Sequence, residues 1–209
     1  MKLTIFGATG QTGKEIVRQA LELGLEVTAV VRDSSELANT SSKLSIVQGD
    51  STKPPDVEKA VAGCAAVLSA LGQVKGSPPD LLTKSASNIV EAMKKNNVRR
   101  LVVLTNAAAR DPKDHPSLFN RFLRFLLTLS RGTMARDTAR EAEIVSESGL
   151  DWTIVRANLL TNTPRTGKYY AGEFSVKAKT RVSRADVAAF MIACVTDNKF
   201  VRAQPVISE

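Results

Sequence analysis

Three glycines at three-residue intervals constrain this chain more than any other feature of its sequence. Gly7, Gly10 and Gly13 lie between an apolar stretch at residues 3–6 and a segment whose apolar residues recur at helical spacing. In a strand–turn–helix unit, the first glycine permits a tight turn, the second lets backbone amides approach an anion, and the third lets the helix pack on the sheet. The pattern predicts a pyrophosphate-binding loop at the positive end of a helix; the alternative is a glycine-rich turn without a ligand.

The rest of the chain repeats the alternation of strand and helix. The predicted strands are residues 3–6, 26–31, 44–47, 65–70, 100–105, 152–155 and 206–208, and the predicted helices are 16–23, 57–61, 81–96, 134–148 and 183–196. The run from Leu101 to Leu104 is continuously apolar, which is typical of a parallel strand that is buried on both faces. The sequence therefore predicts an α/β fold: a Rossmann-like, doubly wound, mostly parallel sheet with helices on both faces.

The chain contains no recognisable linker, so residues 1–209 are predicted to form a single NAD(P)-binding domain. Residues 160–181 are the irregular part, polar and interrupted by Pro164, Gly167 and Gly172. We expect this segment to form a loop or hairpin over the substrate crevice at one end of the sheet.

The end of the second predicted strand bears on the choice of nucleotide. An acidic residue there would bind the ribose 2′-hydroxyl of NAD, but this strand ends at Arg32, whose guanidinium suits a 2′-phosphate. Ser34 and Ser35 follow as further donors, and we expect Asp33 to point outward. The pattern favours NADP over NAD; the alternative is that Arg32 is a solvated loop residue.

Further candidate contacts follow the other strands. Asp50, after the third strand, could accept a hydrogen bond from the adenine amino group, or could equally close a turn or cap a helix. Ligands of open α/β sheets bind beyond the carboxyl ends of the strands. Leu71, Gly72, Thr105 and Asn106 are therefore expected to face the same crevice as the glycine loop.

Composition narrows the range of partners. Lys and Arg number 29 against 21 Asp and Glu, a net charge of +8, but the basic residues are scattered and aromatic residues make up 5%, which argues against nucleic acid as the main partner. No apolar run approaches the ~20 residues of a membrane-spanning helix. The two cysteines, Cys64 and Cys194, lie in apolar contexts, and the first residues lack a signal-peptide pattern. We expect buried reduced thiols and a cytoplasmic location.

Other chemistries find little support in the sequence. The single histidine, His115, lies in a predicted loop, and no group of residues has metal-ligand spacing, so no metal site is predicted. A Tyr-x-x-x-Lys pair is absent, because Glu173 and Phe174 stand four residues after Tyr169 and Tyr170. Alcohol dehydrogenation by a lysine-assisted tyrosine acid is therefore not expected.

An apolar stripe at helical spacing is formed by Phe119, Phe122, Leu123, Leu126 and Leu127. The simplest interpretation is a helix packed on the sheet or a subunit contact. The alternative is a lid over the crevice. Either a monomer or a homodimer is compatible with this pattern.

The glycine motif at residues 6–13, with residues 31–35, 49–50 and 148–150, resembles the atypical short-chain dehydrogenase/reductases. More narrowly, it resembles the NmrA-like group and the biliverdin-IXβ reductase (flavin reductase). The resemblance extends from Met1 to about Ser208. It implies NADPH on the glycine loop and Arg32, adenine near Asp50 and Ser51, and nicotinamide near the ends of the later strands.

The predicted cofactor-binding residues are Gly7, Thr9, Gly10, Gln11, Thr12, Gly13, Arg32, Ser35, Asp50, Ser51, Leu71, Gly72, Thr105 and Asn106. The chain departs from the flavin reductase pattern where that family has Ser after the fifth-strand Thr and a Pro-Pro-His segment. Here Asn106 and the sequence Arg-Ala-Asn at residues 156–158 stand instead, which leaves the acceptor open. The candidates for the substrate wall are Asn106, Arg156, Asn158 and Tyr170.

Two functions follow from these patterns. The first is an NADPH-dependent oxidoreductase that transfers hydride to a delocalised acceptor such as a flavin, quinone or bilin, a reaction in which the protein mainly positions the reactants and excludes water. The second is a non-catalytic NADP-binding redox sensor, regulator or assembly factor with a protein partner. An open crevice above Leu71 and Asn106 would favour the reductase, and a crevice closed by bulky side chains would favour the sensor. The small run at residues 106–109 suggests room for a small-molecule acceptor.

Overall fold

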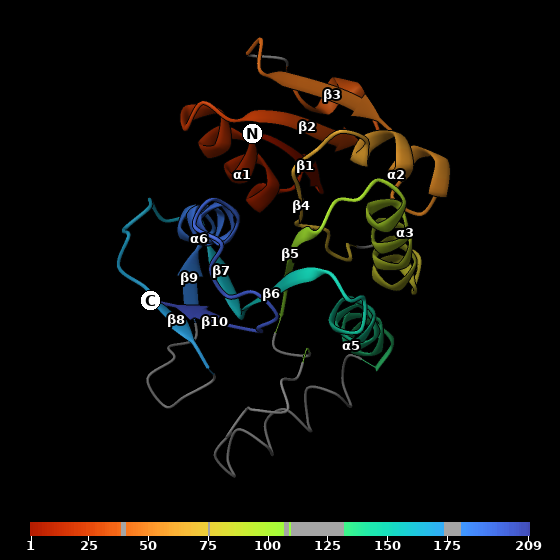
Figure 1. Cartoon of the computed structure of the whole chain (residues 1–209). Helices are drawn as coiled ribbons and strands as arrows, with labels where there is room; N and C mark the ends of the chain where they lie inside the picture. The colour runs from red at the N-terminus through yellow and green to blue at the C-terminus, as the bar shows by residue number, and fades with distance from the viewer. Residues whose placement is uncertain (39–40, 75, 107–108, 110–131, 174–180) are drawn as a thin grey trace.

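The computed structural model describes residues 1–38, 41–74, 76–106, 109, 132–173 and 181–209 (Figure 1). The helices are α1 (Gln11–Glu22), α2 (Pro54–Val61), α3 (Leu81–Lys95), α5 (Gly132–Ser146) and α6 (Arg184–Thr196), with a short 3₁₀ turn η1 (Ser34–Glu36). The strands are β1 (Lys2–Phe6), β2 (Glu26–Val31), β3 (Leu44–Gln48), β4 (Ala66–Ser69), β5 (Arg100–Thr105), β6 (Asp151–Ala157), β7 (Leu159–Thr161), β8 (Tyr170–Gly172), β9 (Arg181–Ser183) and β10 (Val206–Ser208). Each strand and helix for which a range was predicted from the sequence is present; strands β2, β5 and β10 have the predicted ends, and the ends of the other elements differ from the prediction.

One eight-stranded sheet forms the centre of the molecule, in the order β3-β2-β1-β4-β5-β6-β10-β8. Neighbouring strands run parallel except β10 and β8, which pair antiparallel. The chain leaves β1 for β2 on one side and later returns to β4 on the other, so the strand order reverses beside β1. The predicted Rossmann-like, doubly wound fold is confirmed, and ligands of such sheets bind at this reversal.

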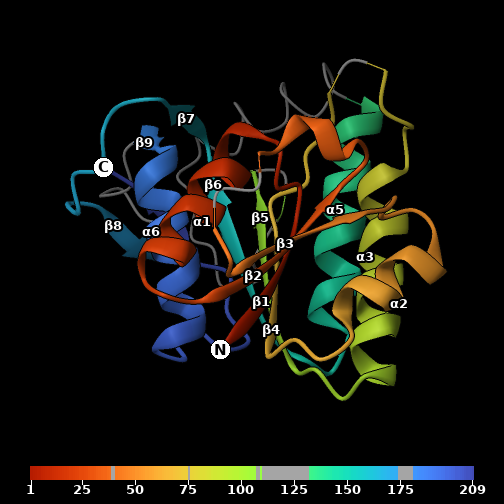
Figure 2. The ribbon, with the colours of Figure 1, turned by 90° about the horizontal axis from the view of Figure 1, so that it is seen from above.

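Helices cover both faces of the sheet, as Figure 2 shows. Helices α1 and α6 pack together on one face, and α2, α3 and α5 pack together on the other. In β5, Val102 and Leu104 belong to the core beneath α1 and α6, whereas Leu101 and Val103 belong to the opposite core. The burial of this strand on both faces, predicted from its continuous apolar run, is confirmed.

Capping residues fix the start of α6 and tie down a neighbouring loop. The Ser183 hydroxyl accepts a hydrogen bond from the Asp186 amide (2.9 Å) and donates one to the Asp186 carboxylate (2.7 Å). This pair of bonds caps the helix that the sequence predicted to begin at residue 183. The Asp186 carboxylate also accepts bonds from the amides of Thr166 and Gly167, at 3.0 and 2.8 Å. Part of the segment 160–181 is thereby fixed against α6.

Three short strands were not predicted. Within and beside residues 160–181, β7 pairs in parallel with β9, and β8 joins the edge of the large sheet through β10. Each is three residues long, too short for an alternating pattern to stand out. That the chain is a single domain stays a prediction. His115 and the apolar stripe from Phe119 to Leu127 lie outside the described residues.

Candidate functional site

The turn after β1 takes a shape that only glycine accommodates. Gly7 has a φ of +75°, and a Cβ atom there would lie 2.6 Å from the carbonyl oxygen of Ala70, which follows β4. The turn is closed by the amide of Gly10, which donates to the Gly7 carbonyl oxygen at 3.1 Å. The loop is therefore pressed against the end of a neighbouring strand at the point where the strand order reverses.

The third glycine, Gly13, allows α1 to pack closely on the loop and does not itself line the cavity. A Cβ atom on Gly13 would lie 2.0 Å from the Gly7 carbonyl oxygen, so the first turn of α1 lies directly on the loop. Gly10 is the N-cap of α1 and provides no side-chain bond to the first turn. The amides at the start of α1 consequently remain available to an anion in front of the helix.

A cavity of about 1510 Å³ begins at this loop and extends across the carboxyl ends of the parallel strands to α5. The predicted residues that line it are Gly7, Thr9, Gly10, Gln11, Thr12, Arg32, Asp50, Ser51, Leu71, Gly72, Thr105, Asn106 and Asn158. Four predicted site residues do not line it: Gly13, Ser35, Arg156 and Tyr170. The cavity exceeds the ~300–1,000 Å³ typical of small-molecule sites, so it has room for a dinucleotide and a second molecule.

Arg32 follows β2 at the rim of the cavity, with an exposed side chain. Its carbonyl oxygen accepts a bond from the Gln48 side chain at 3.1 Å, which fixes the backbone there. The Asp33 carboxylate is turned to Ser35 and accepts its amide (2.9 Å) and its hydroxyl (2.8 Å). The bond from the Ser35 amide, followed by that from its hydroxyl, lowers the pKa of Asp33.

The geometry after β2 corrects the prediction for Ser35. Its hydroxyl hydrogen is engaged by Asp33 in a local turn, and its side chain does not line the cavity. A short Asp followed two residues later by Ser favours this self-contained turn over a bond to a ligand. Asp33 lies outside the cavity lining, as expected from the sequence.

Asp50 lines the cavity and also closes a turn. One carboxylate oxygen accepts both the amide and the hydroxyl of Thr52, each at 2.8 Å. The bond from the Thr52 amide is the largest cause that lowers the pKa of Asp50. Next to it, the Ser51 hydroxyl is buried and bonded to the Ser85 hydroxyl at 2.8 Å. The turn role, one of the two alternatives for Asp50, is thus present in the structure.

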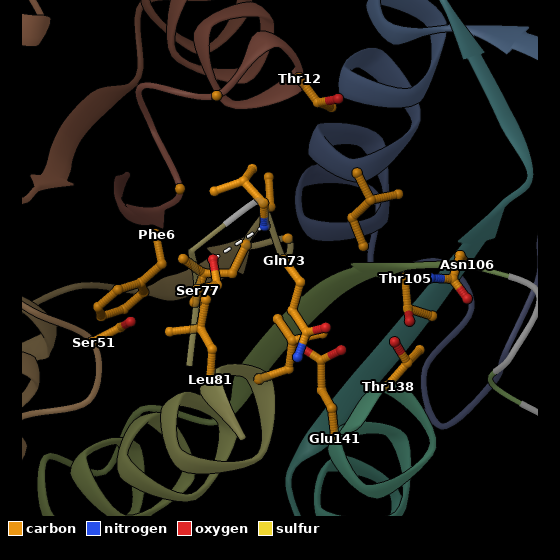
Figure 3. Close-up of a pocket in the computed structure, with 18 of the residues that line it drawn as sticks. Phe6, Thr12, Ser51, Gln73, Ser77, Leu81, Thr105, Asn106, Thr138 and Glu141 are labelled. Carbon is orange, nitrogen blue, oxygen red and sulfur yellow. Dashed lines mark hydrogen bonds between the residues drawn. The ribbon is translucent and has the colours of Figure 1, made fainter. Parts of the chain in front are cut away.

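The far end of the cavity is formed by β5, α5 and the segment that follows β4 (Figure 3). Asp137 in α5 reaches across to the start of α3 and accepts bonds from the amides of Leu82 and Thr83, both at 2.9 Å. It also accepts the Gln73 side-chain amide at 2.5 Å and the Thr83 hydroxyl at 2.6 Å. The Asp137 carboxylate therefore caps α3 from a different helix. The N-cap residue of α3, Asp80, makes no side-chain hydrogen bond to the first turn.

One turn further along α5, Glu141 is also buried, but unlike Asp137 it has a carboxyl oxygen without a hydrogen bond to the described residues. It lines the cavity but is 3% exposed, and its Oε2 atom has no hydrogen-bond partner within the described part of the chain. Burial raises the pKa of Glu141 well above its usual range, and the negative charge of Asp137 raises it further. Both causes favour the protonated, neutral form of the side chain.

Two further buried polar atoms at this end lack partners among the described residues. They are the Thr105 hydroxyl and the Gln204 side-chain oxygen, and each residue is 8% exposed and lines the cavity. Buried polar atoms are nearly always hydrogen-bonded in native proteins. Their concentration here marks this end of the cavity as a place for a polar ligand atom.

Sequence reasoning did not identify Glu141 or Gln204. A signal for the first was present: Asp137 and Glu141 are four residues apart on the face of α5 that carries the buried Ala142 and Val145. Acidic residues on the buried face of an amphipathic helix require a partner or a function. Gln204 lies in the irregular approach to β10, where no pattern predicts which way its side chain points.

Two candidates for the substrate wall do not line the cavity. Arg156 is 2% exposed within β6, between β5 and β10, and its guanidinium donates to the carbonyl oxygen of Gln204 at 2.8 Å. Tyr170 lies in the edge strand β8, and its hydroxyl donates to the carbonyl oxygen of Glu173 at 2.8 Å. Both side chains serve local structure, because strand pairing rather than sequence order decided where they lie.

A protein-family model described as NAD(P)H-binding matches residues 7–198 of the chain. The chain belongs to this family. The match begins at the first glycine of the loop and ends just beyond α6, so it includes all the cavity-lining residues except Phe6 and Gln204. The NAD(P)-binding family expected from the sequence motifs is confirmed.

Two curated relatives are proteins of plants. The chain is 38% identical over 180 residues to an uncharacterized chloroplastic protein of Arabidopsis thaliana, which covers 79% of this chain and 61% of the relative. It is 29% identical over 177 residues to the chloroplastic protein TIC 62 of rice, which covers 73% of this chain and 34% of the relative. The chain therefore spans less than two thirds of the length of either protein.

Solved structures share the fold. An anaerobilin reductase from Escherichia coli O157:H7 superposes with a TM-score of 0.83 at 20% identity, covering 100% of this chain and 97% of the other. A short-chain dehydrogenase/reductase from Veillonella parvula, in complex with NADP, superposes with a TM-score of 0.81 at 19% identity, covering 100% and 94%. At these identities the likeness establishes the architecture.

The plant relatives correct the predicted cytoplasmic location, because both are chloroplastic proteins. Buried thiols are compatible with any reducing compartment, so they do not distinguish the cytoplasm from an organelle. Cys64 and Cys194 are buried and unpaired, and burial raises the pKa of Cys194 to about 12. In the part of the chain that the structure describes, no helix has the length and apolar character to cross a membrane.

Proposed function

We propose that the chain is an NADPH-dependent reductase that passes hydride to a delocalised small-molecule acceptor. The observation that carries this proposal is the cavity itself: it begins at the glycine loop and Arg32 and continues past Leu71 and Asn106 to a second, polar end. A sensor without a reaction would have no need of the second end. The acceptor, a flavin, quinone or bilin, would lie there, and the partner is thus a small molecule.

The residues of the first end fit a phosphorylated dinucleotide. The loop is tight: a Cβ atom on Gly7 would lie 2.6 Å from the Ala70 carbonyl oxygen, and one on Gly10 would lie 3.3 Å from the Gly7 carbonyl oxygen. Gly10 is also the N-cap of α1, so the loop leads directly into the amides of the first helical turn. Arg32 would hold the 2′-phosphate by paired donors. Asp50 and Ser51 would lie beside the adenine. The bound coenzyme would supply a hydride, and the protein would orient the acceptor and exclude water.

The test measures nicotinamide absorbance with NADPH and with NADH, in the presence and absence of FMN, riboflavin and a quinone. We expect acceptor-dependent oxidation of NADPH, and in Arg32→Ala a loss of affinity for NADPH of about tenfold or more with little change for NADH. Lys53→Ala serves as the control, because Lys53 does not line the cavity. Tight binding of NADPH without oxidation by any acceptor would instead establish a regulator.

A further inference from the structure

We propose that Glu141 is the proton donor of this reductase and that the acceptor is a neutral conjugated carbonyl compound. Its carbonyl oxygen would be bound at the polar end of the cavity by Glu141 and Thr105. The inference rests on the proposed function and deepens it. It adds a protein acid to a reaction that the sequence analysis described without one, and it selects one class among the proposed acceptors.

Glu141 has a buried carboxyl oxygen without a hydrogen-bond partner among the described residues. Its side chain comes from α5 and points into the cavity together with Thr105 and Thr138, as Figure 3 shows. It is 3% exposed, and Oε2 has no partner among the described residues. Leaving such an atom buried and unpaired costs free energy of folding, so a ligand atom that completes the hydrogen bond is favoured there.

The surroundings favour the protonated form of this acid. Asp137 is the charged group whose field acts on Glu141, and it lies four residues earlier on the same helix. The cavity-lining residues of α3 and β5 are neutral, as is Gln73 before α3. The other charged lining residues nearby are Arg136 and Glu143 on α5 and Arg184 at the start of α6, and the charge that shifts the pKa of Glu141 is that of Asp137. Asp137 is itself held in place by four hydrogen bonds, so its charge stays close to Glu141. An ionised Glu141 would face both burial and repulsion.

A matching acceptor needs an oxygen that becomes more basic during the reaction. As hydride adds to the electrophilic carbon of a conjugated carbonyl, an electron pair moves to the oxygen. The O–H bond of Glu141 breaks and its proton moves to that oxygen, leaving a carboxylate. The acceptor is reduced by two electrons, the nicotinamide is oxidised, and water restores the proton to Glu141 afterwards. The Thr105 hydroxyl would hydrogen-bond to the same oxygen.

The first experiment needs no coenzyme and no turnover. Infrared difference spectra of the free protein are recorded for the wild type against Glu141→Gln at neutral pH. We expect the carbonyl stretch of a protonated carboxyl group in the wild type and its absence in the variant. Glu147→Gln, on the exposed stretch just after α5, is the matched control and should retain the band. Carboxylate bands alone from Glu141 would overturn the proposal.

The second experiment compares two acceptors with NADPH. Menadione, a neutral quinone, gains a proton on its oxygen, whereas methylene blue is a cation that becomes neutral on taking hydride alone. We expect Glu141→Gln to lower kcat for menadione by about a hundredfold or more and to leave kcat for methylene blue within about threefold. In the wild type, kcat for menadione should fall as pH rises through the ionisation of Glu141, and the variant should lack this fall.

The outcomes separate this proposal from the one on which it rests. Equal losses with both acceptors would indicate a structural role for Glu141 and overturn the proton-donor role, as would unchanged kinetics with menadione. In both cases the reductase would stand, since the wild type still oxidises NADPH. If the wild type binds NADPH and reduces neither acceptor, the proposed function falls first and the proton-donor role falls with it.

Discussion

At the loop end of the cavity, close contacts between backbone atoms decide the shape, whereas at the α5 end side chains are left with polar atoms unpaired. Gly7 and Gly13 admit no side chain without collision. Thr105, Glu141 and Gln204 each have a buried polar atom without a partner in the described residues. Backbone packing fixes the shape of the loop end before any ligand binds, whereas the side chains at the α5 end would gain hydrogen bonds from a ligand. The residues of the loop end therefore favour a stable fold, whereas at the α5 end stability is lowered by polar atoms that are left free to bind a ligand.

The same contrast occurs within one helix. Asp137 and Glu141 lie one turn apart on α5 and are both buried. Asp137 accepts four hydrogen bonds and caps α3, so it stabilises the fold as a carboxylate. Glu141 destabilises the fold whenever it ionises, because its charge would be buried beside that carboxylate. Substitutions at the two positions should consequently shift stability in opposite directions.

The largest effect is expected at the loop end. Gly13→Ala places a Cβ atom 2.0 Å from the Gly7 carbonyl oxygen, so α1 must move away from the loop. We expect a loss of about 3 kcal/mol or more in the free energy of unfolding, measured by urea denaturation. Binding of NADPH should weaken as well. Gly132→Ala is the matched control, because a Cβ atom there meets nothing within 4 Å; equal stability of the two variants would refute the packing role of Gly13.

An intermediate effect is expected at the cap of α3. Asp137→Ala leaves the amides of Leu82 and Thr83 without their carboxylate, which should cost about 2 kcal/mol of unfolding free energy. Asp80→Ala at the same helix end breaks an exposed pair with Lys84 (2.9 Å) and should cost well under about 1 kcal/mol. The two denaturation curves decide which residue caps the helix. A larger loss for Asp80→Ala would contradict the assignment to Asp137.

The effect expected at Glu141 depends on pH: it is close to zero in acid and grows as pH rises. The pKa of Glu141 in the folded state is raised above the unfolded value of about 4.5. Below that value both states are protonated, and wild type and Glu141→Gln should differ little. As pH rises, the unfolded state ionises first, so the wild type loses stability until the folded state ionises too. The slope is at most ~1.4 kcal/mol per pH unit.

Unfolding free energies of wild type and Glu141→Gln, compared across this pH range, test the sign. The variant should become the more stable protein as pH rises, in contrast to the loss expected for Asp137→Ala. Parallel pH profiles for the two proteins would show that Glu141 is not a buried neutral acid. Glu147→Gln again provides the control, with no divergence from the wild type expected.

Local patterns in the sequence were sufficient for some parts of the site. The glycine spacing predicted the loop and the packing of α1, and Ser183 with Asp186 predicted the start of α6. These features depend on neighbours within a few residues, so a short pattern contains them. Arg156 and Tyr170 could not be placed in this way. The direction in which their side chains point depends on pairing with strands about 30 to 50 residues away in the chain. A short sequence pattern contains no information about such pairing.

The sequence by itself determined the alternation of strands and helices, the parallel sheet and the loop at Gly7, because hydrophobic period and glycine chemistry act locally. Only the tertiary structure decided that Asp137 caps a helix more than 50 residues away and that Glu141 is buried without a partner. Both outcomes depend on how α5 packs against α3 and β6. The charge state of a carboxyl group follows its surroundings, and folding brings those surroundings together from distant parts of the chain.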